Sequence, residues 1–219
     1  MNQDIMVSII VIAFAGLVTV IALLGTRSSR IKKENALREY CASKGWTIDI
    51  ENGPTKKTTR IVGDNWQIIS ESIAQNTSDS TGASGWQQNT TWTLKGKGTF
   101  PEYVLGKGAL PMDADTCPPW IKSALETKLQ AEFGFGTEAL AQGMLDEPLR
   151  HRFLLFAPDR AAERVMNELN ALLREWPNAM PLLIRSGKSG VTVILTGHKM
   201  NAVTDLTRLV SIGLASAGV

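Results

Sequence analysis

The first feature of the chain is an uncharged apolar run at residues 5–24, which opens with Ile5 and closes with Leu24. A helix needs about 20 apolar residues to cross the hydrocarbon core of a bilayer. Ser8 and Thr19 are polar within the run, but helical Ser and Thr hydroxyls can bond to carbonyls of their own helix. The run predicts a single transmembrane helix, which together with the basic segment after it forms an anchor at residues 1–30.

Beyond the anchor, several short segments predict half-buried strands, because apolar and polar positions alternate with period two at 46–50 and 85–94, and at 66–73 with one shift of phase. These segments are residues 46–50, 58–62, 66–73, 85–94 and 100–105. Turn-forming or Ser/Thr-rich stretches separate them, so we expect an antiparallel meander of four or five strands. Apolar residues at helical spacing predict one helix at 31–44, before the meander, and another at 120–133, after it. These elements make up the segment 31–149.

The segment 150–219 has the most regular pattern. A short apolar run at 152–157 predicts a buried strand, and runs at 182–185 and 191–196 predict a hairpin. Between them, apolar side chains recur at the spacing of one helical face. The members of this stripe are Val165, Met166, Leu169, Leu172, Leu173 and Trp176. A last helix follows Asn201, which gives the order β-α-β-β-α. The predicted fold class is α+β. We expect the segment 150–219 to pack on the same core as the meander or on an adjacent one.

Charge beside the apolar run predicts its orientation. The acidic residue Asp4 is the only charge before the run, and four positive residues follow it before any acid: Arg27, Arg30, Lys32 and Lys33. Positive residues beside a span stay on the cytoplasmic side. We therefore expect an outward N-terminus, a cytoplasmic domain and the lipid bilayer as a partner. In arrangement alone, this resembles single-pass proteins of the bacterial inner membrane. A cleaved signal peptide would instead need a basic N-terminus and a shorter apolar run.

The remaining charge gives no sign of a nucleic-acid surface. The net charge of the whole chain is +2, and the four positive residues after the run account for this excess. The rest is therefore close to neutral, whereas nucleic-acid-binding domains carry a basic patch. The two cysteines, Cys41 and Cys117, lie far apart and match no metal or redox spacing.

Residues 186–190 contain Gly-Lys-Ser, part of a phosphate-binding loop. That motif requires a glycine five positions before its second glycine, where this chain has Leu182. A strand rather than a helix follows the loop, so no helix N-terminus is present to bind phosphate. We expect no nucleotide cofactor here.

Other residues that could carry chemistry are scattered. Asp113, Asp115 and Cys117 alternate in one irregular segment, and His151 and His198 are the two histidines. Alternating carboxylates can bind a hard cation, but a thiolate suits a different kind of metal. Neither histidine has a ligand partner at a recognised spacing. We expect no metal site and no catalytic set.

The segment 85–94 is the candidate interaction strand, because it is unusually polar and uncharged. Its candidate residues are Trp86, Gln87, Asn89, Thr91, Trp92 and Thr93. An uncharged edge strand is open to pairing with another chain. Period two places Trp86, Trp92 and Leu94 on one face, either in the core or as anchors of an interface. The other four tryptophans are expected in the core: Trp46, Trp66, Trp120 and Trp176.

Two functions fit these observations. The first is a non-catalytic interaction or assembly module at the cytoplasmic face of the membrane, with a protein partner or a second copy bound at the polar strand. The second is a membrane-tethered enzyme or ligand sensor, with a site assembled from Asp113, Asp115, His151 and His198. The first explains the anchor and the polar strand together.

Overall fold

The computed structural model describes residues 28–75, 85–96, 100–107, 140–158 and 160–219, together with residues 120, 123, 127, 130 and 131. The predicted span at 5–24 lies outside these residues. Among the helices that are described, none combines the length and apolar character that crossing a membrane requires.

Eight strands form one antiparallel sheet in the described ranges. They are β1 (Thr47–Asn52), β2 (Lys56–Val62), β3 (Trp66–Gln75), β4 (Gly85–Leu94), β5 (Tyr103–Lys107), β6 (Leu154–Phe156), β7 (Leu182–Gly187) and β8 (Gly190–Thr196). Their spatial order is β1-β2-β3-β4-β8-β7-β5-β6. The helices are residues 28–43, η2 (Gln142–Met144), α3 (Glu147–Arg150), α4 (Ala162–Arg174) and α5 (Val203–Ala217). The fold is α+β, as the patterning predicted.

The meander is present as four strands rather than five. Strands β1 to β4 pair in sequence order, but β5 lies between β7 and β6. In β5, Tyr103, Val104 and Leu105 are each at most 5% exposed, so both faces of this strand are covered. A strand buried on both faces belongs inside a sheet, where both edges are also paired, and this explains its place away from the meander.

The C-terminal order β6-α4-β7-β8-α5 matches the predicted β-α-β-β-α unit. Leu169 and Leu173 on α4 are 0% exposed, which confirms the predicted buried stripe. Strand β8 pairs with β4, so a single sheet continues from the meander into this unit. One hydrophobic cluster likewise contains buried side chains from both 31–149 and 150–219.

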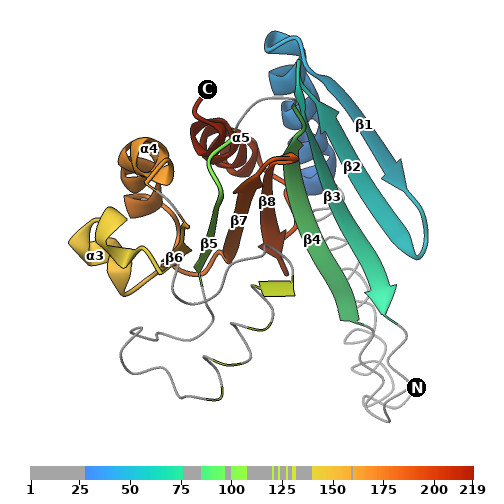
Figure 1. Cartoon of the computed structure of the whole chain (residues 1–219). Helices are drawn as coiled ribbons and strands as arrows, with labels where there is room; N and C mark the ends of the chain where they lie inside the picture. Colours follow the sequence, from blue (N-terminus) through green and yellow to red (C-terminus); the bar gives the residue numbers. More distant parts are fainter. Residues whose placement is uncertain are drawn as a thin grey trace, which may run out of the picture.

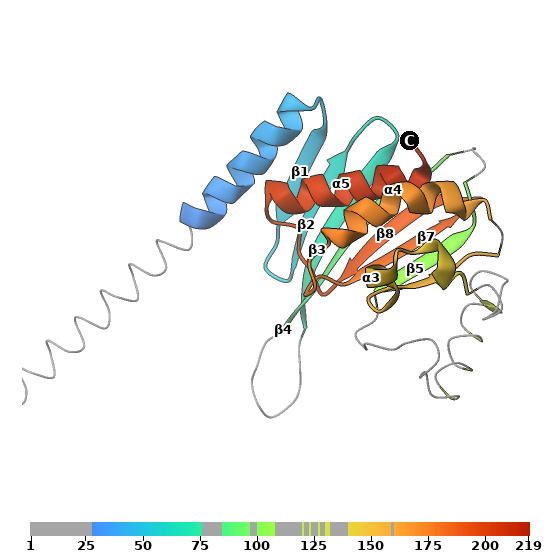
Figure 2. The same ribbon diagram turned by 90° about the vertical axis from the view of Figure 1, so that its left-hand side faces the viewer.

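The described helices cover one face of the sheet. Figure 1 shows them on one side of the strands, and Figure 2 shows α4 and α5 side by side over that side, with the helix 28–43 beyond β1. We call the covered side the inner face and the opposite side the open face. No described helix lies on the open face (Figure 1).

An aromatic series joins the helix 28–43 to the centre of the inner face. The ring centroids are 6.0 Å apart for Tyr40 and Trp46, 4.8 Å for Trp46 and Trp66, and 6.4 Å for Trp66 and Trp92. Trp66 and Trp92 are buried, as is Trp176. The prediction for Trp120 was wrong, because its side chain is 72% exposed. A helical stripe shows which residues share a face, but not whether another element packs against that face.

Candidate functional site

Strand β4, the predicted interaction strand, is not an edge strand. It pairs with β3 along its whole length, and Asn89–Leu94 pair with β8 on the other side. The edge hypothesis is therefore wrong for most of the strand. The backbone carbonyl of Gln88 also accepts a hydrogen bond from Gly197 N at 2.7 Å. The partner strand β8 lies about a hundred positions later, so no local pattern could reveal this pairing.

The two faces of β4 have different roles, and the predicted alternation is correct. Trp92 on the inner face is 0% exposed and belongs to the core. Trp86 lies on the same face near the strand's start and is 39% exposed. The ammonium nitrogen of Lys57 stands 4.7 Å from the Trp86 ring centroid, a cation–π contact. Trp92 is thus a core residue, while Trp86 is accessible to solvent.

The polar candidates Gln87, Asn89, Thr91 and Thr93 point to the open face. The register places Thr91 between Ile69 of β3 and Ile194 of β8, and Leu183 of β7 continues the row. All four side chains of this row are half-buried. The middle of the open face is therefore a row of one threonine and three aliphatic side chains, flanked by further Thr and Asn residues.

Charged residues lie towards the two sides of the open face. Lys56 of β2 forms an ion pair with Glu71 of β3, with Nζ and Oε1 2.6 Å apart, and Asp49 of β1 stands opposite Arg60. Arg185 marks the β7 side. Between these groups, β4 and β8 present no charged side chain to the open face. The face thus has an uncharged middle between charged flanks.

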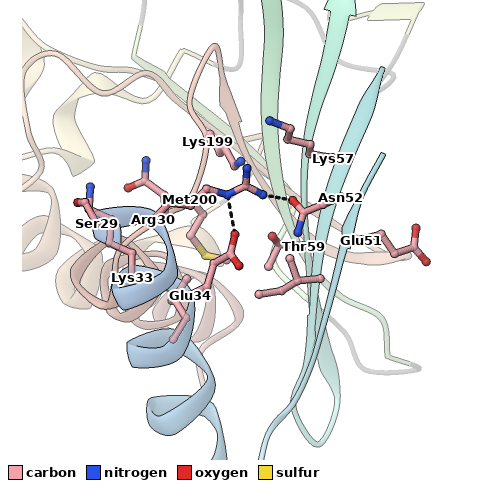
Figure 3. Close-up of a pocket in the computed structure, with 13 residues that line it drawn as sticks. Ser29, Arg30, Lys33, Glu34, Glu51, Asn52, Lys57, Thr59, Lys199 and Met200 are labelled. Carbon is pink, nitrogen blue, oxygen red and sulfur yellow. Dashed lines mark hydrogen bonds and ion pairs between the residues drawn. The ribbon is translucent and has the colours of Figure 1, made fainter. Parts of the chain in front are cut away.

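A second feature, which sequence analysis missed, is a cleft of about 340 Å³ on the other side of β1 and β2. It lies among the start of the described helix 28–43, the strands β1 and β2, and the segment after β8 (Figure 3). Its lining is mainly polar or charged: Ser29, Arg30, Lys33, Glu34, Glu51, Asn52, Lys57, Thr59, Lys199 and Asn201, with Leu37, Ile50 and Met200. No motif could have indicated it, because its residues come from three distant segments.

Hydrogen bonds inside the fold fix one wall of the cleft. The backbone N–H of Met200 donates to Ser70 Oγ at 3.1 Å and to Thr90 Oγ1 at 3.2 Å. The Thr90 hydroxyl donates to the backbone carbonyl of His198 at 2.9 Å. Gly197, with a φ of +73°, supplies the left-handed turn that brings this segment back over the inner face. Lys199 is thereby held beside β2.

The other wall is the helix 28–43. Arg30 Nε donates to Glu34 Oε1 at 2.9 Å, and the Arg30 guanidinium also donates to Asn52 Oδ1. Figure 3 shows Lys57 and Lys199 on the same side of this guanidinium, while the carboxylate of Glu51 points away from it. Of the predicted membrane-stop residues, Arg30 and Lys33 line the cleft, Lys32 is exposed, and Arg27 lies outside the described residues.

The remaining candidates form no common site among the described residues. His151 is exposed, and His198 Nε2 lies 3.6 Å from Asp205 Oδ2. Asp113, Asp115 and Cys117 lie outside the described ranges. Within those ranges, no group of three or more His, Cys, Asp or Glu side chains could hold a metal ion. The Gly-Lys-Ser segment forms the β7–β8 hairpin, as predicted, since β7 ends at Gly187 and β8 begins at Gly190.

The fold is thus a sheet with helices on one face, an open face with an uncharged middle, and a basic cleft beside the first described helix. Comparison of the chain with protein-family models, with curated proteins and with solved structures finds no match.

Proposed function

We propose that this chain is a non-catalytic interaction module, held at the cytoplasmic face of a membrane, that binds a protein partner through its open face. The observation that carries the proposal is the distribution of charge on that face. Protein interfaces are depleted of charged residues at their centre and have a polar rim. The row of Ile69, Thr91, Ile194 and Leu183, with charged flanks on β2 and β7, has this arrangement.

The partner's chemistry follows from the same row. A surface that covers half-buried Ile, Leu and Thr side chains without leaving a charge unpaired must itself be uncharged at its centre. The partner packs on the face rather than extending the sheet at β1. The reason is that β1 carries Asp49 and Glu51, and charged side chains on an edge strand disfavour the addition of another strand.

Site-specific photocrosslinking tests this function in intact membranes. A photoreactive amino acid replaces Thr91 at the middle of the face, and the control replaces the exposed Thr47 on β1. We expect Thr91 to give one discrete adduct with a protein that mass spectrometry can identify, and Thr47 to give none. An adduct with a second copy of the chain would replace the proposed partner by a homodimer. The absence of any discrete adduct from Thr91 would overturn the proposal.

The matched pair Thr91→Lys and Thr47→Lys tests affinity for the protein so identified. A lysine at Thr91 buries a charge at the middle of the interface, so we expect at least about tenfold weaker binding, about 1.4 kcal/mol. Thr47→Lys should leave binding unchanged. Both variants should keep the thermal midpoint of the parent, since a lysine on an exposed sheet face can extend its ammonium into water. Equal binding by both variants would exclude the row as the contact.

The location of the domain needs its own test. Cys41 is 0% exposed, and burial raises the pKa of its thiol, so it will react poorly on either side of a membrane. A cysteine introduced at Lys188, in the exposed β7–β8 turn, is a better reporter. A membrane-impermeant thiol reagent should label Lys188→Cys in permeabilised cells and not in intact cells. Labelling in intact cells would place the domain outside.

A further inference from the structure

The cleft gathers positive charge that its own carboxylates do not balance. Arg30, Lys57 and Lys199 come from three segments of the chain, and Glu34 is the one acidic lining residue that faces them. Glu34 is already paired with Arg30. Within the described part of the chain, no carboxylate forms an ion pair with Lys57 in the cleft or with Lys199. The cleft therefore has a local excess of positive charge.

The charged form of Lys199 is less favourable in the cleft than it is in water. Partial burial lowers the pKa of Lys199, and the charges of Lys57 and Arg30 lower it further, while Glu34 offsets this only in part. The hydrogen bonds from Met200 to Ser70 and Thr90 hold the segment in place against this repulsion. A lysine whose pKa is lowered by burial and by neighbouring positive charges is typical of a binding site, because an anionic ligand offsets the repulsion between those charges.

The donors in the cleft remain available to a ligand. A guanidinium has five N–H groups, and Arg30 uses two of them, one for Glu34 and one for Asn52. An ammonium group has three N–H donors, and Lys57 and Lys199 each supply one such group. A planar guanidinium beside two ammonium groups suits the several acceptor oxygens of a phosphate.

We propose that this cleft binds a phosphate group, carried either by the headgroup of an anionic lipid or by a soluble phosphate ester. The volume of about 340 Å³ admits a phosphate with a small substituent, such as a glycerol or a sugar. A lipid headgroup is a source consistent with the sequence, because Arg30 lies only six positions after Leu24, where the predicted span ends. Basic residues this close to a cytoplasmic leaflet are attracted to anionic lipid.

The cleft is separate from the surface proposed to bind a protein. Asn52, Lys57 and Thr59 point to the inner face, whereas Thr91 and its row point to the open face. Loss of phosphate binding would therefore leave the crosslinking result at Thr91 intact, and the reverse also holds. The two proposals fail independently.

The test compares two double variants of the full chain with the same change in net charge. Lys57→Gln with Lys199→Gln removes two ammonium groups from the cleft. Lys32→Gln with Lys188→Gln removes two exposed ammonium groups outside it. One arm titrates inorganic phosphate and glycerol 3-phosphate into the protein in nonionic detergent at constant ionic strength, with the thermal midpoint as readout. The other arm uses native mass spectrometry after reconstitution with phosphatidylglycerol or with phosphatidylcholine.

We expect the parent and the control variant to respond to at least one anionic probe, and the cleft variant to bind that probe about tenfold more weakly or worse. A response to phosphatidylglycerol alone identifies a lipid headgroup, and a response to phosphate or glycerol 3-phosphate in detergent identifies a soluble ester. No response of the parent to any probe would overturn the proposal. An equal loss in both double variants would also overturn it, by showing general charge attraction.

Lys199→Gln alone separates a binding role from a structural one. If Lys199 serves a ligand, replacing it with glutamine relieves the repulsion from Lys57 and Arg30, so the thermal midpoint without added probe should stay the same or rise while probe binding falls. If Lys199 serves only the fold, the midpoint should fall and probe binding should be unchanged, which would refute the proposal. This single variant also keeps the test decisive if the double variant does not fold.

Discussion

Gly213 of α5 lies directly against the buried indole of Trp92, which makes Gly213→Ala the sharpest test of how this core is packed. A Cβ atom at Gly213 would stand 2.5 Å from both Cδ2 and Cε2 of Trp92 and 2.8 Å from Cε3. Ordinary contacts between carbon atoms are about 3.5–4.0 Å long. The Trp92 ring is 0% exposed and stacks on Trp66, so it has little room to move away.

Two effects of opposite sign decide the outcome. Alanine in a helix interior is favoured over glycine by about 1 kcal/mol. Forcing an extra methyl into a well-packed core costs about 1–3 kcal/mol. Because the clash involves several ring atoms and the ring is fully buried against Trp66, we expect a cost in the upper part of that range. The net loss in unfolding free energy should be about 1–2 kcal/mol.

Urea denaturation of the full chain in detergent, followed by tryptophan fluorescence, measures this loss. Gly143→Ala is the matched control, because a Cβ there meets nothing within 4 Å. A second comparison introduces Gly213→Ala into a Trp92→Phe variant, where the smaller ring leaves space for the added methyl group. There the substitution should be neutral or stabilising. If Gly213→Ala stabilised the parent, or cost the same in both backgrounds, the contact with Trp92 would not limit the packing of α5.

Three further predictions use the same denaturation assay. Leu169→Ala should lower the unfolding free energy by about 2–5 kcal/mol because the Leu169 side chain is fully buried, and Leu172→Ala should lower it less because Leu172 is half-buried. Equal losses would show that the buried face of α4 is misassigned. Thr90→Val should lower the unfolding free energy by about 1–3 kcal/mol, because the Thr90 hydroxyl forms hydrogen bonds with two backbone groups of the loop after β8. A change near zero would contradict that role. Burial raises the pKa of Tyr103, so the folded state favours its neutral form. The unfolding free energy therefore keeps its full value below the ordinary tyrosine pKa of about 10 and falls as the pH rises above it. Tyr103→Phe should flatten the loss of stability above that pH, although it also removes the hydrogen bond to the Ser216 carbonyl; an unchanged pH profile would refute the assignment.

Sequence periodicity predicted those elements whose buried face or partner strand is marked within a short stretch of the chain. The stripe through Leu169 and Leu173 marks one side of α4, and the alternation in β7 and β8 leads into a tight hairpin. In the hairpin the partner strand also lies close along the chain, whereas in α4 the stripe marks the buried face but not its main neighbour α5, which begins about 30 positions later. The pairing of β1 to β4 is local in a similar sense, since each strand pairs with the one before it in the sequence.

The strand pairings between distant segments of the chain could not be predicted in this way. Nothing in the sequence of β5 distinguishes a fifth meander strand from one inserted between β7 and β6. The outward side chains of β4 are uncharged, which is equally compatible with an edge strand and with a central strand whose outer side is half-covered by its neighbours. Only the pairing of Asn89–Leu94 with β8 decides between them.

That same pairing also forms the cleft. Arg30, Lys57 and Lys199 each look like an ordinary solvated charge in the sequence, and they are separated by up to 169 positions. The cleft forms because β8 runs beside β4 to Thr196, and the chain then turns at Gly197 and attaches through Met200 to Ser70 and Thr90. Ser70 stands opposite Thr59 of β2, which lies two positions along the strand from Lys57 and on the same face. The long-range contact that rules out an open edge at β4 therefore places the third positive charge beside the other two.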